Sequence, residues 1–436
     1  MDSPVFGDVQ PATMIVTSAA DNGKGTAHAW VDDNGNVVLP RQIADRYGLR
    51  PGVKLLIEDG GDSIRLRRPV THLAKIYIEP TNACNLNCRT CIRNVWDEPL
   101  GRMSAQTYDR LMQGIKQLPL PLTVSFSGFG EPLSHPNIAE MVRQAKACGA
   151  TVELITNGTL LTGEMSRLLI GAGLDVLWVS LDGASPESYA DVRLAQALPN
   201  ILENLQRFHS LCLDAPRRPE LGIAFVAMKR NIGDLPAVIR LGSRFGASRY
   251  SISGVLAHTA EMADEVLYWR TLGESVPRSS RWVPVVRLPR LDINEDTHEA
   301  LYRVMRGGRS VIAAGTLWGE KVDRCPFIEG GTMSIGWQGN VSPCLALLHD
   351  DTSIVGNLVR TARRYAVGNV NDRTIYDIWM DPAYVAFRER VQGFEFAPCT
   401  YCGGCNLGES NEEDCFGNEF PTCGGCLWAQ GVIQCP

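Results

Sequence analysis

The sequence contains no long apolar run and no excess of basic charge, and both absences narrow the classes of protein to consider. No stretch reaches the roughly 18 apolar residues that a membrane-spanning helix requires. The net charge of -6 at pH 7 argues against a general nucleic-acid scavenger or a protein that binds membrane surfaces. Residues 1–4 open no basic-then-apolar export signal. We therefore expect a cytoplasmic protein.

Cysteine, by contrast, is abundant, with 14 in the chain. Three lie close together at Cys84, Cys88 and Cys91, and nine lie between Cys325 and the C-terminal end. A secreted chain would use such cysteines in disulfides, but a reducing cytosol keeps thiols free. Clustered thiolates in a reducing compartment are typical of metal sites.

Four regions with different residue patterns divide the chain. Residues 1–24 are small and polar, and they predict a flexible tail. Residues 25–70 are β-rich, with turn signals that predict hairpins. Residues 71–288 alternate apolar strands with amphipathic helices. Residues 289–436 are rich in loops and cysteines, which indicates a domain folded partly around metal.

The alternation of strands and helices over residues 71–288 predicts an α/β fold with a parallel sheet and helices outside it. Strands are expected at 75–79, 123–127, 151–156, 176–181, 222–228 and 249–254. Helices are expected between them, for example at 105–117, 138–147, 163–172 and 235–245. Six such units make a partial (β/α)6 barrel of the TIM type, with its active site at the carboxyl ends of the strands.

The first cysteine group has the spacing C-x3-C-x2-C and follows the first predicted strand directly. Three thiolates on one loop can bind three irons of a [4Fe–4S] cube and leave the fourth iron free to chelate a small molecule. A zinc knuckle is the alternative, but it requires a fourth ligand nearby. The position of the loop at a strand end favours the catalytic cluster.

Here the chain resembles the radical S-adenosylmethionine (SAM) superfamily. Residues 127–132, at the end of the second strand, are similar to the Gly-Gly-Glu-Pro segment of the family, with its first glycine at Gly128 and one residue inserted. The resemblance implies that the backbone around Gly128, Gly130 and Glu131 receives the methionine amino group of SAM. Glycine lets a backbone approach a ligand closely. An ordinary Gly-rich turn is the alternative for this segment taken alone.

Two further strand ends match family positions, at Asn157 after the third strand and at Ser180 and Asp182 after the fourth. The resemblance implies that Ser180 and Asp182 lie near the ribose and methionine of SAM, although Asp182 could equally be a turn residue. Thr90 stands where the family usually has an aromatic residue near the adenine. The reaction implied is reductive cleavage of SAM to a 5′-deoxyadenosyl radical, followed by hydrogen abstraction. The cofactors carry that chemistry and the protein positions them.

The C-terminal cysteines resemble the SPASM extension of radical SAM enzymes, which carries auxiliary [4Fe–4S] clusters. The expected ligands are Cys325, Cys344, Cys399, Cys402, Cys405, Cys415, Cys423, Cys426 and Cys435. We expect one or two auxiliary clusters. Two clusters need eight thiolates, so one cysteine of the nine is expected to be spare. A zinc ribbon built on the C-x2-C pairs Cys399/Cys402 and Cys423/Cys426 is the alternative, and it gives no role to Cys325, Cys344 and Cys435.

Residues 25–70 resemble a swapped-hairpin domain of the AbrB/MazE type. Such domains usually dimerise, and many bind DNA through an arginine near a Gly-Arg turn, where this chain has Asn36. We therefore expect a homodimer, or capture of a client protein, rather than DNA binding.

The substrate is suggested by three segments, at 77–82, 91–101 and 423–431. They resemble the maturases associated with tungsten-containing aldehyde ferredoxin oxidoreductases. From this resemblance we expect the partner to be the tungsten-containing oxidoreductase or its pterin cofactor. We also expect a low-potential electron donor such as ferredoxin or flavodoxin. Asp97 or Glu98, just after the cluster loop, could accept a proton after radical formation, or could simply cap the next helix.

Two other functions remain open. A peptide- or protein-modifying enzyme, of the sulfatase-maturase kind or of the kind that acts on ribosomal peptides, would share every cluster. A redox-sensing DNA-binding protein would show no SAM turnover, and the lack of a strongly basic composition counts against it.

Overall fold

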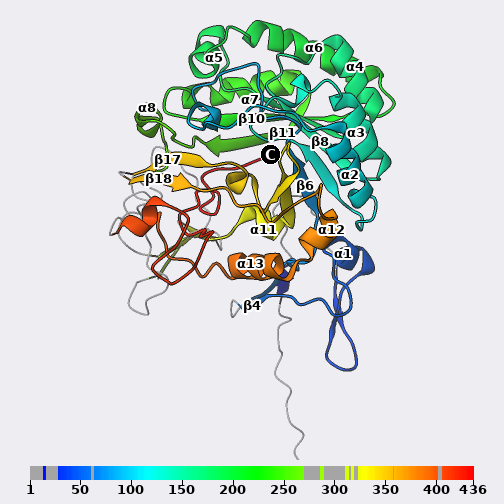
Figure 1. Cartoon of the computed structure of the whole chain (residues 1–436), viewed down its shortest axis with the longest axis vertical. Coiled ribbons are helices and arrows are strands. Elements are labelled where there is room, and N and C mark those ends of the chain that lie inside the picture. The colour runs from blue at the N-terminus through cyan, green and yellow to red at the C-terminus, as the bar shows by residue number, and fades with distance from the viewer. Residues whose placement is uncertain are drawn as a thin grey trace, which may run out of the picture.

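The computed structural model describes residues 28–59, 63–269, 323–356, 358–400 and 405–436, and the short strands at 13–15, 285–288, 310–313 and 316–318. The centre of the described structure is a nine-stranded sheet in the order β11-β10-β9-β8-β7-β6-β15-β16-β19. Helices lie along the outside of the curved half of this sheet (Figure 1).

Six parallel strands form the curved half and confirm the predicted α/β class. They are β6 (Lys75–Ile78), β7 (Thr123–Phe126), β8 (Thr151–Thr156), β9 (Val176–Ser180), β10 (Glu220–Ala227) and β11 (Ala247–Gly254). The outer helices are α2 (Ala105–Ile115), α3 (Ile138–Ala147), α4 (Gly163–Ala172), α5 (Pro186–Arg193), α6 (Leu198–Asp214) and α7 (Leu235–Arg244). Each predicted strand is present, and the arrangement is consistent with a partial barrel. The helices α5 and α6 fill the interval between β9 and β10, where helices were expected without stated bounds.

The remaining three strands come from the C-terminal region. β15 (Thr332–Ile335) pairs in parallel with β6, and β16 (Asn340–Ser342) and β19 (Gly368–Asn369) follow in antiparallel order. At the end of the first pair, the backbone N–H of Glu79 donates to the carbonyl of Ile335 at 2.9 Å. The cysteine-rich region therefore continues the sheet of the barrel, next to the strand that leads into the cluster loop.

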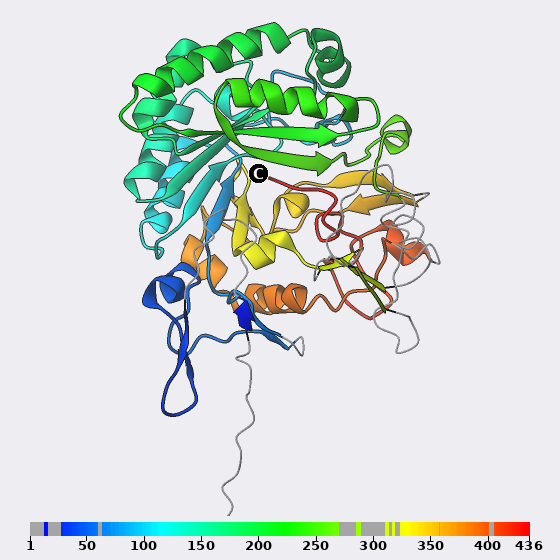
Figure 2. The same cartoon turned by 180° about the vertical axis from the view of Figure 1, so that it is seen from behind.

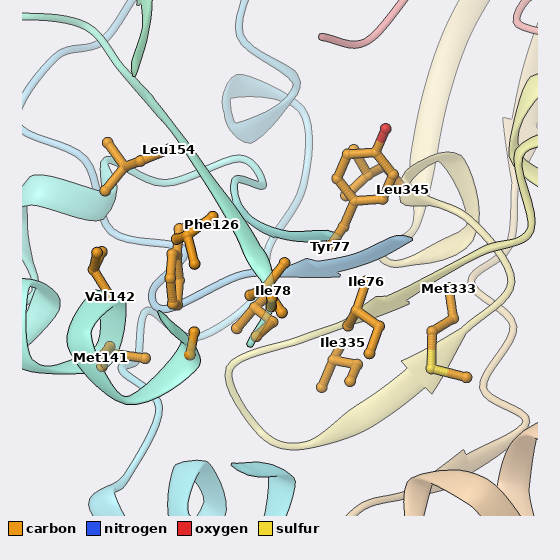
Figure 3. Close-up of a cluster of buried hydrophobic side chains, with 14 of the residues drawn as sticks. Ile76, Tyr77, Ile78, Phe126, Met141, Val142, Leu154, Met333, Ile335 and Leu345 are labelled. Carbon is orange, nitrogen blue, oxygen red and sulfur yellow. The ribbon is translucent and has the colours of Figure 1, made fainter. Parts of the chain in front are cut away.

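The core explains why these strands join. Ile76 and Ile78 of β6, Phe126 of β7 and Ile335 of β15 are completely buried. Figure 3 shows Ile76 beside Ile335, across the boundary between barrel and C-terminal strands. Full burial of a side chain of this size contributes about 1.5–3 kcal/mol. The apolar face of β6 is therefore shared by both regions of the chain.

The N-terminal region differs from prediction at one point. Thr13–Ile15, predicted to belong to a flexible tail, is instead a strand, β1. It pairs in parallel with β5 (Ser63–Leu66), which pairs with β4 (Ile57–Asp59). The β-branched Thr13 and Ile15 are well suited to such pairing.

The rest of the N-terminal region is small. The predicted hairpin is present as β2 (Trp30–Val31) and β3 (Val37–Val38), followed by α1 (Arg41–Arg46). Figures 1 and 2 show α1 level with α13 (Pro382–Gly393) and β4 just below it, at the end of the molecule away from the barrel helices.

The remaining described elements lie in the C-terminal half. They are α8 (Ala260–Asp264), β12 (Val285–Leu288), β13 (Ser310–Ala313), β14 (Thr316–Trp318), α11 (Pro326–Gly330), β17 (Asp351–Val355), β18 (Leu358–Ala362) and α12 (Ile375–Trp379). β12, predicted to end the barrel region, pairs with β13 of the next region. Among the described helices, none is long and apolar enough to cross a membrane.

A buried arginine fastens α13 to the chain that enters the barrel. Arg388 is fully buried, and its Nε and Nη2 donate to the carbonyls of Val70 and Trp379 at 2.8 and 2.6 Å. Its guanidinium lies 3.7 Å from the ring centroid of Trp379 and 4.1 Å from that of Tyr384. Burial lowers the pKa of Arg388 to about 10, so the side chain remains charged at neutral pH.

We predict that Arg388→Ala lowers the free energy of unfolding by about 3 kcal/mol, because each buried carbonyl left without a donor costs about 1–3 kcal/mol. Chemical denaturation with tryptophan fluorescence would measure the change. Glu389→Ala, on the same helix, is the control, since that side chain is 45% exposed and its ion pair in the described structure is with the exposed Lys54. The control should change stability by less than about 0.5 kcal/mol. Equal losses in both variants would contradict the anchoring role.

Candidate active site and cysteine groups

The loop that follows β6 brings the three predicted cysteines together. Cys88 is buried, and Cys84 and Cys91 are half-buried. Burial is the main cause that raises the pKa of Cys84 and Cys91, and the nearby Cys88 raises both further. Thiolates this close together repel one another, and a bound metal stabilises the deprotonated form. Their chemistry fits three ligands of a [4Fe–4S] cluster.

Helix α5 lies outside this loop and is hydrogen-bonded to it. The backbone N–H of Arg89 donates to the carbonyl of Val192 at 3.1 Å, and Arg89 Nε donates to the carbonyl of Asp191 at 2.7 Å. Within the loop, Asn94 Nδ2 donates to the carbonyl of Cys88 at 2.8 Å. The barrel therefore helps to fix the positions of the three cysteines.

The same helix ends in Arg193, which the sequence reasoning missed. Its Nη1 lies 3.5 Å from the sulfur of Cys88, and its Nη2 lies 2.5 Å from Asp182 Oδ2. Burial alone would lower the pKa of Arg193, but Asp182 and Cys88 reverse this and raise it. A fixed positive charge therefore lies beside the cluster loop. Nothing in the sequence motif marked Arg193, because its position depends on the length of α5.

Asp182 and Ser180 lie at the end of β9 as predicted, but both carboxylate oxygens of Asp182 are occupied by partners within the protein. Its side chain is completely buried, Oδ1 accepts from the N–H of Val226 at 2.8 Å, and Oδ2 pairs with Arg193. Ser180 is half-buried. The geometry therefore brings Asp182 to the site as the partner of Arg193.

The glycine turn after β7 approaches the first strand very closely. Gly128 has a φ of +138°, and a Cβ there would lie 2.7 Å from the Glu79 side chain. A Cβ on Gly130 would lie 2.0 Å from the carbonyl oxygen of Thr81. No larger residue fits either position without moving the backbone. The turn is therefore held against the strand that precedes the cluster loop.

Glu131 ties this turn to the next strand. It is buried, and its carboxylate accepts from Leu133 N–H at 3.0 Å, Thr156 Oγ1 at 2.7 Å and Asn157 N–H at 2.8 Å. Burial raises its pKa, although these donors oppose the shift. Asn157 in turn donates to Asn85 Oδ1 of the cluster loop at 2.9 Å. With the Glu131 carboxylate occupied by protein donors, the backbone of the turn is the part left for a ligand.

A histidine from the C-terminal region completes the site. His349 Nε2 lies 2.9 Å from Glu79 Oε2, and His349 Nδ1 lies 2.8 Å from Glu98 Oε2. The Trp96 ring packs against the imidazole at 4.2 Å and the Phe129 ring at 5.6 Å, both edge-on. Of the two predicted acids, Glu98 therefore lies in the site, whereas Asp97 is exposed. His349 follows no motif, and its sequence signal is only its position five residues after Cys344.

Four C-terminal cysteines line one cavity. Cys325, Cys344, Cys423 and Cys426 all contribute to its wall. Burial is the main cause that raises the pKa of each of these thiols, and the neighbouring thiols add to the shift for Cys325, Cys344 and Cys423. Four converging thiols are the ligand set of a complete [4Fe–4S] cluster.

Cys399, Cys405 and Cys415 form another group, since Cys405 and Cys415 both act on the pKa of Cys399, which burial mainly raises. Cys402, predicted as a further ligand, lies outside the described residues. Among the residues that are described, no three His, Cys, Asp or Glu side chains are close enough together to bind a single metal ion.

One buried guanidinium lies between the two cysteine groups. Arg360 is 7% exposed and donates from Nη1 to the carbonyl of Gly408 at 3.1 Å. Burial lowers its pKa, while Cys399 of one group and Cys423 and Cys426 of the other act to raise it. A Cβ on Gly425 would lie 1.7 Å from this guanidinium, so the close approach requires glycine there.

Cys435, which was also predicted as a metal ligand, has a different environment. Its sulfur accepts from Trp428 Nε1 at 3.3 Å. The adjacent Pro436 carbonyl accepts from Lys75 Nζ at 3.1 Å and Tyr77 Oη at 3.4 Å, on the first barrel strand. Figure 1 shows this end of the chain beside the barrel strands. The geometry favours Cys435 as the spare cysteine of the nine.

The barrel also has polar atoms suited to a small ligand. Ser127 Oγ, at the end of β7, and Trp178 Nε1, on β9, are buried without a hydrogen-bond partner in the described structure. Buried polar atoms are normally paired, so such atoms near a proposed ligand site require an explanation. Both fit a polar ligand such as SAM lying across the strand ends.

Removal of single cysteines separates these assignments. We predict that Cys344→Ala loses about four irons per chain after anaerobic reconstitution, because one complete cluster loses a ligand. Cys435→Ala should keep the iron and sulfide content of the unmodified protein. Iron and acid-labile sulfide assays measure both. Loss of iron from Cys435→Ala would place that cysteine among the ligands instead.

Comparisons with known proteins agree with this geometry. Residues 78–215 match the model of the radical SAM superfamily, and residues 325–406 match that of the SPASM iron–sulfur cluster-binding domain. The chain is 28% identical over 369 residues to the tungsten-containing aldehyde ferredoxin oxidoreductase cofactor-modifying protein of Pyrococcus furiosus, covering 83% of this chain and 96% of that protein. It is 25% identical over 382 residues to an AdoMet-dependent heme synthase of Oleidesulfovibrio alaskensis, covering 80% and 84%.

Among solved structures, the chain resembles native anSMEcpe with bound AdoMet and Kp18Cys peptide. The TM-score is 0.50 at 14% sequence identity, over 83% of this chain and 97% of that one. This likeness concerns the fold alone. The first match contains the three-cysteine loop, the second contains Cys325 and Cys344 of the four-cysteine cavity, and the chain is a radical SAM enzyme with a SPASM iron–sulfur domain.

Proposed function

We propose that this enzyme matures a tungsten-containing oxidoreductase, by modifying its pterin cofactor or the oxidoreductase itself. The observation that carries the proposal is the extent of the likeness to the Pyrococcus furiosus cofactor-modifying protein, which covers 96% of that protein. A low-potential donor such as ferredoxin or flavodoxin would supply the electrons.

When bound, the [4Fe–4S] cluster and SAM supply one-electron cleavage that yields methionine and a 5′-deoxyadenosyl radical. Cys84, Cys88 and Cys91 would bind that cluster. The turn around Gly128 and Gly130 would receive the methionine end of SAM through its backbone. These residues fix distances and exclude water, which is the contribution that a protein makes to cofactor chemistry.

Arg193 and the C-terminal groups would set the charge around these cofactors. The Arg193 guanidinium, 3.5 Å from the Cys88 sulfur, would offset part of the negative charge of a thiolate-bound cluster. Cys325, Cys344, Cys423 and Cys426 would bind one auxiliary cluster, and Cys399, Cys402, Cys405 and Cys415 another.

The contacts of Asp97 and Glu98, the two acids after the cluster loop, indicate different roles for them. Glu98 Oε2 faces His349 at 2.8 Å and Glu98 Oε1 faces Arg364 at 3.5 Å, so a substrate proton would have to displace one of these partners. Asp97 is exposed and remains the acid that a substrate could reach directly. We therefore propose Asp97 as the proton acceptor and Glu98 as a positioning residue.

A peptide-modifying activity is the second candidate. It is favoured by 25% identity over 355 residues to the PqqA peptide cyclase of Streptomyces rochei, which covers 76% of this chain and 84% of that protein. In either case, we propose that residues 25–70 form an AbrB/MazE-like homodimerisation domain. Three apolar side chains of its hairpin support this, because Trp30, Val31 and Val37 are at least half exposed.

The reaction class predicts a direct assay. Anaerobically reconstituted enzyme, given SAM and a low-potential reductant, should release methionine and 5′-deoxyadenosine. Cys88→Ala should abolish this release, because the cluster would lose one of its three thiolates. Cys148→Ala, which removes a half-buried thiol on the outer helix layer, should retain it. Release that survives in Cys88→Ala would place the reactive cluster elsewhere.

The substrate proposal predicts a selective response. The metal-loaded, unmodified tungsten oxidoreductase should increase 5′-deoxyadenosine formation several-fold over the substrate-free rate, and a change of mass should appear in its pterin or polypeptide. A library of short peptides is the matched comparison. Stimulation by a peptide alone would replace the proposal with the peptide-modifying activity.

A further inference from the structure

We propose that His349 of the C-terminal domain positions the SAM-binding turn of the barrel through Glu79, so that SAM binding depends on correct docking of the SPASM domain. This inference rests on the proposed SAM contact of the turn around Gly128 and Gly130. It does not depend on which substrate the enzyme modifies.

Glu79 is the link between the two regions. Its side chain is completely buried at the end of β6. Oε1 accepts from the backbone N–H of Phe129 at 3.0 Å, and Oε2 faces His349 at 2.9 Å. The absence of a side chain at Gly128 leaves room for Glu79 to reach this amide. A single carboxylate therefore holds the glycine turn on one oxygen and the C-terminal domain on the other.

His349 supplies the charge that this arrangement needs. Both ring nitrogens face carboxylates, so both carry protons when the two acids are ionised. Burial would lower the pKa of His349, but Glu79 and Glu98 outweigh this and raise it. Glu98 also has a second charged partner in the described structure, because Arg364 faces its other carboxylate oxygen. The imidazolium is therefore the cation between two acids that would otherwise repel each other.

The segment that carries His349 also carries a predicted cluster ligand. Cys344 lies in the four-cysteine cavity, and one 3-10 turn, Leu345–Leu347, separates it from His349. Leu345, Leu347 and Leu348 are all buried, so the turn has little freedom to move independently. A displacement at Cys344 would therefore shift His349, and through Glu79 it would shift the turn that faces SAM.

Loss of the imidazole would leave Glu79 with no cation. A buried carboxylate without a partner is costly, and it would take up a proton or move towards solvent. In either case the Phe129 amide loses a charged acceptor, and the turn loses the contact that fixes it. The chain offers a matched control, since His258 of the barrel region lies 3.3 Å from Asp351 of the C-terminal segment, and its hydrogen-bond and ion-pair partners in the described structure do not include the turn.

The test compares His349→Gln with His258→Gln in the reconstituted full-length enzyme, without any second substrate. Calorimetry would give SAM affinity, and the electron paramagnetic resonance spectrum of the reduced protein would report SAM at the cluster. We expect His349→Gln to bind SAM at least tenfold more weakly at unchanged iron content, with a loss of the SAM-induced spectral change. His258→Gln should remain within about twofold of the unmodified enzyme. Unchanged affinity in His349→Gln would overturn the proposal.

The unmodified enzyme gives a second test if His349→Gln does not fold. Because Glu79 and Glu98 raise the pKa of His349, the imidazolium persists to a higher pH than in an ordinary histidine and is lost as pH rises through that raised pKa. SAM affinity should therefore fall as pH rises through the pKa of His349, and Glu98→Gln should move this fall to lower pH because one acid no longer stabilises the cation. The proposal would be overturned by a SAM affinity that does not change with pH. It would also be overturned if the fall in SAM affinity occurred at the same pH in Glu98→Gln as in the unmodified enzyme. Both readouts are independent of the tungsten substrate.

Discussion

The parallel pairing of β15 with β6 is the interaction on which the rest of the site depends. It places the cysteine-rich region against the one strand whose end leads into the cluster loop. Without that pairing, His349 would have no route to Glu79, and the cavity of four cysteines would have no fixed relation to the barrel. The shared apolar face, with Ile76 beside Ile335, makes the pairing favourable, because both side chains leave water completely.

Charge inside the molecule follows a consistent rule, since the buried charged groups of the site are each matched by a partner. Arg193 is matched by Asp182, and His349 by Glu79 and Glu98. Breaking such a pair costs more than forming it contributes, because the remaining charge stays buried. These pairs therefore act as positional constraints, and they hold the cluster loop, the glycine turn and the C-terminal domain in one register.

The sequence predicts the barrel well because its signals are local. Apolar strands that alternate with amphipathic helices identify all six barrel strands, and the cysteine spacing identifies the cluster loop. Prediction from the sequence fails for features that depend on a contact between residues far apart in the chain. His349 and Glu79 are 270 residues apart, and no periodicity connects them. Arg193 is similarly hidden, because only the folded length of α5 brings it to Cys88. Thr13–Ile15 was missed because its partner strand begins at Ser63.

Arg360 has a consequence for how the two cysteine groups influence each other. One guanidinium lies near thiols of both groups, and Gly425 leaves room for it. A change of charge in either group therefore changes the electrostatic field that the other group experiences through the shared arginine. The two cysteine groups are electrostatically coupled.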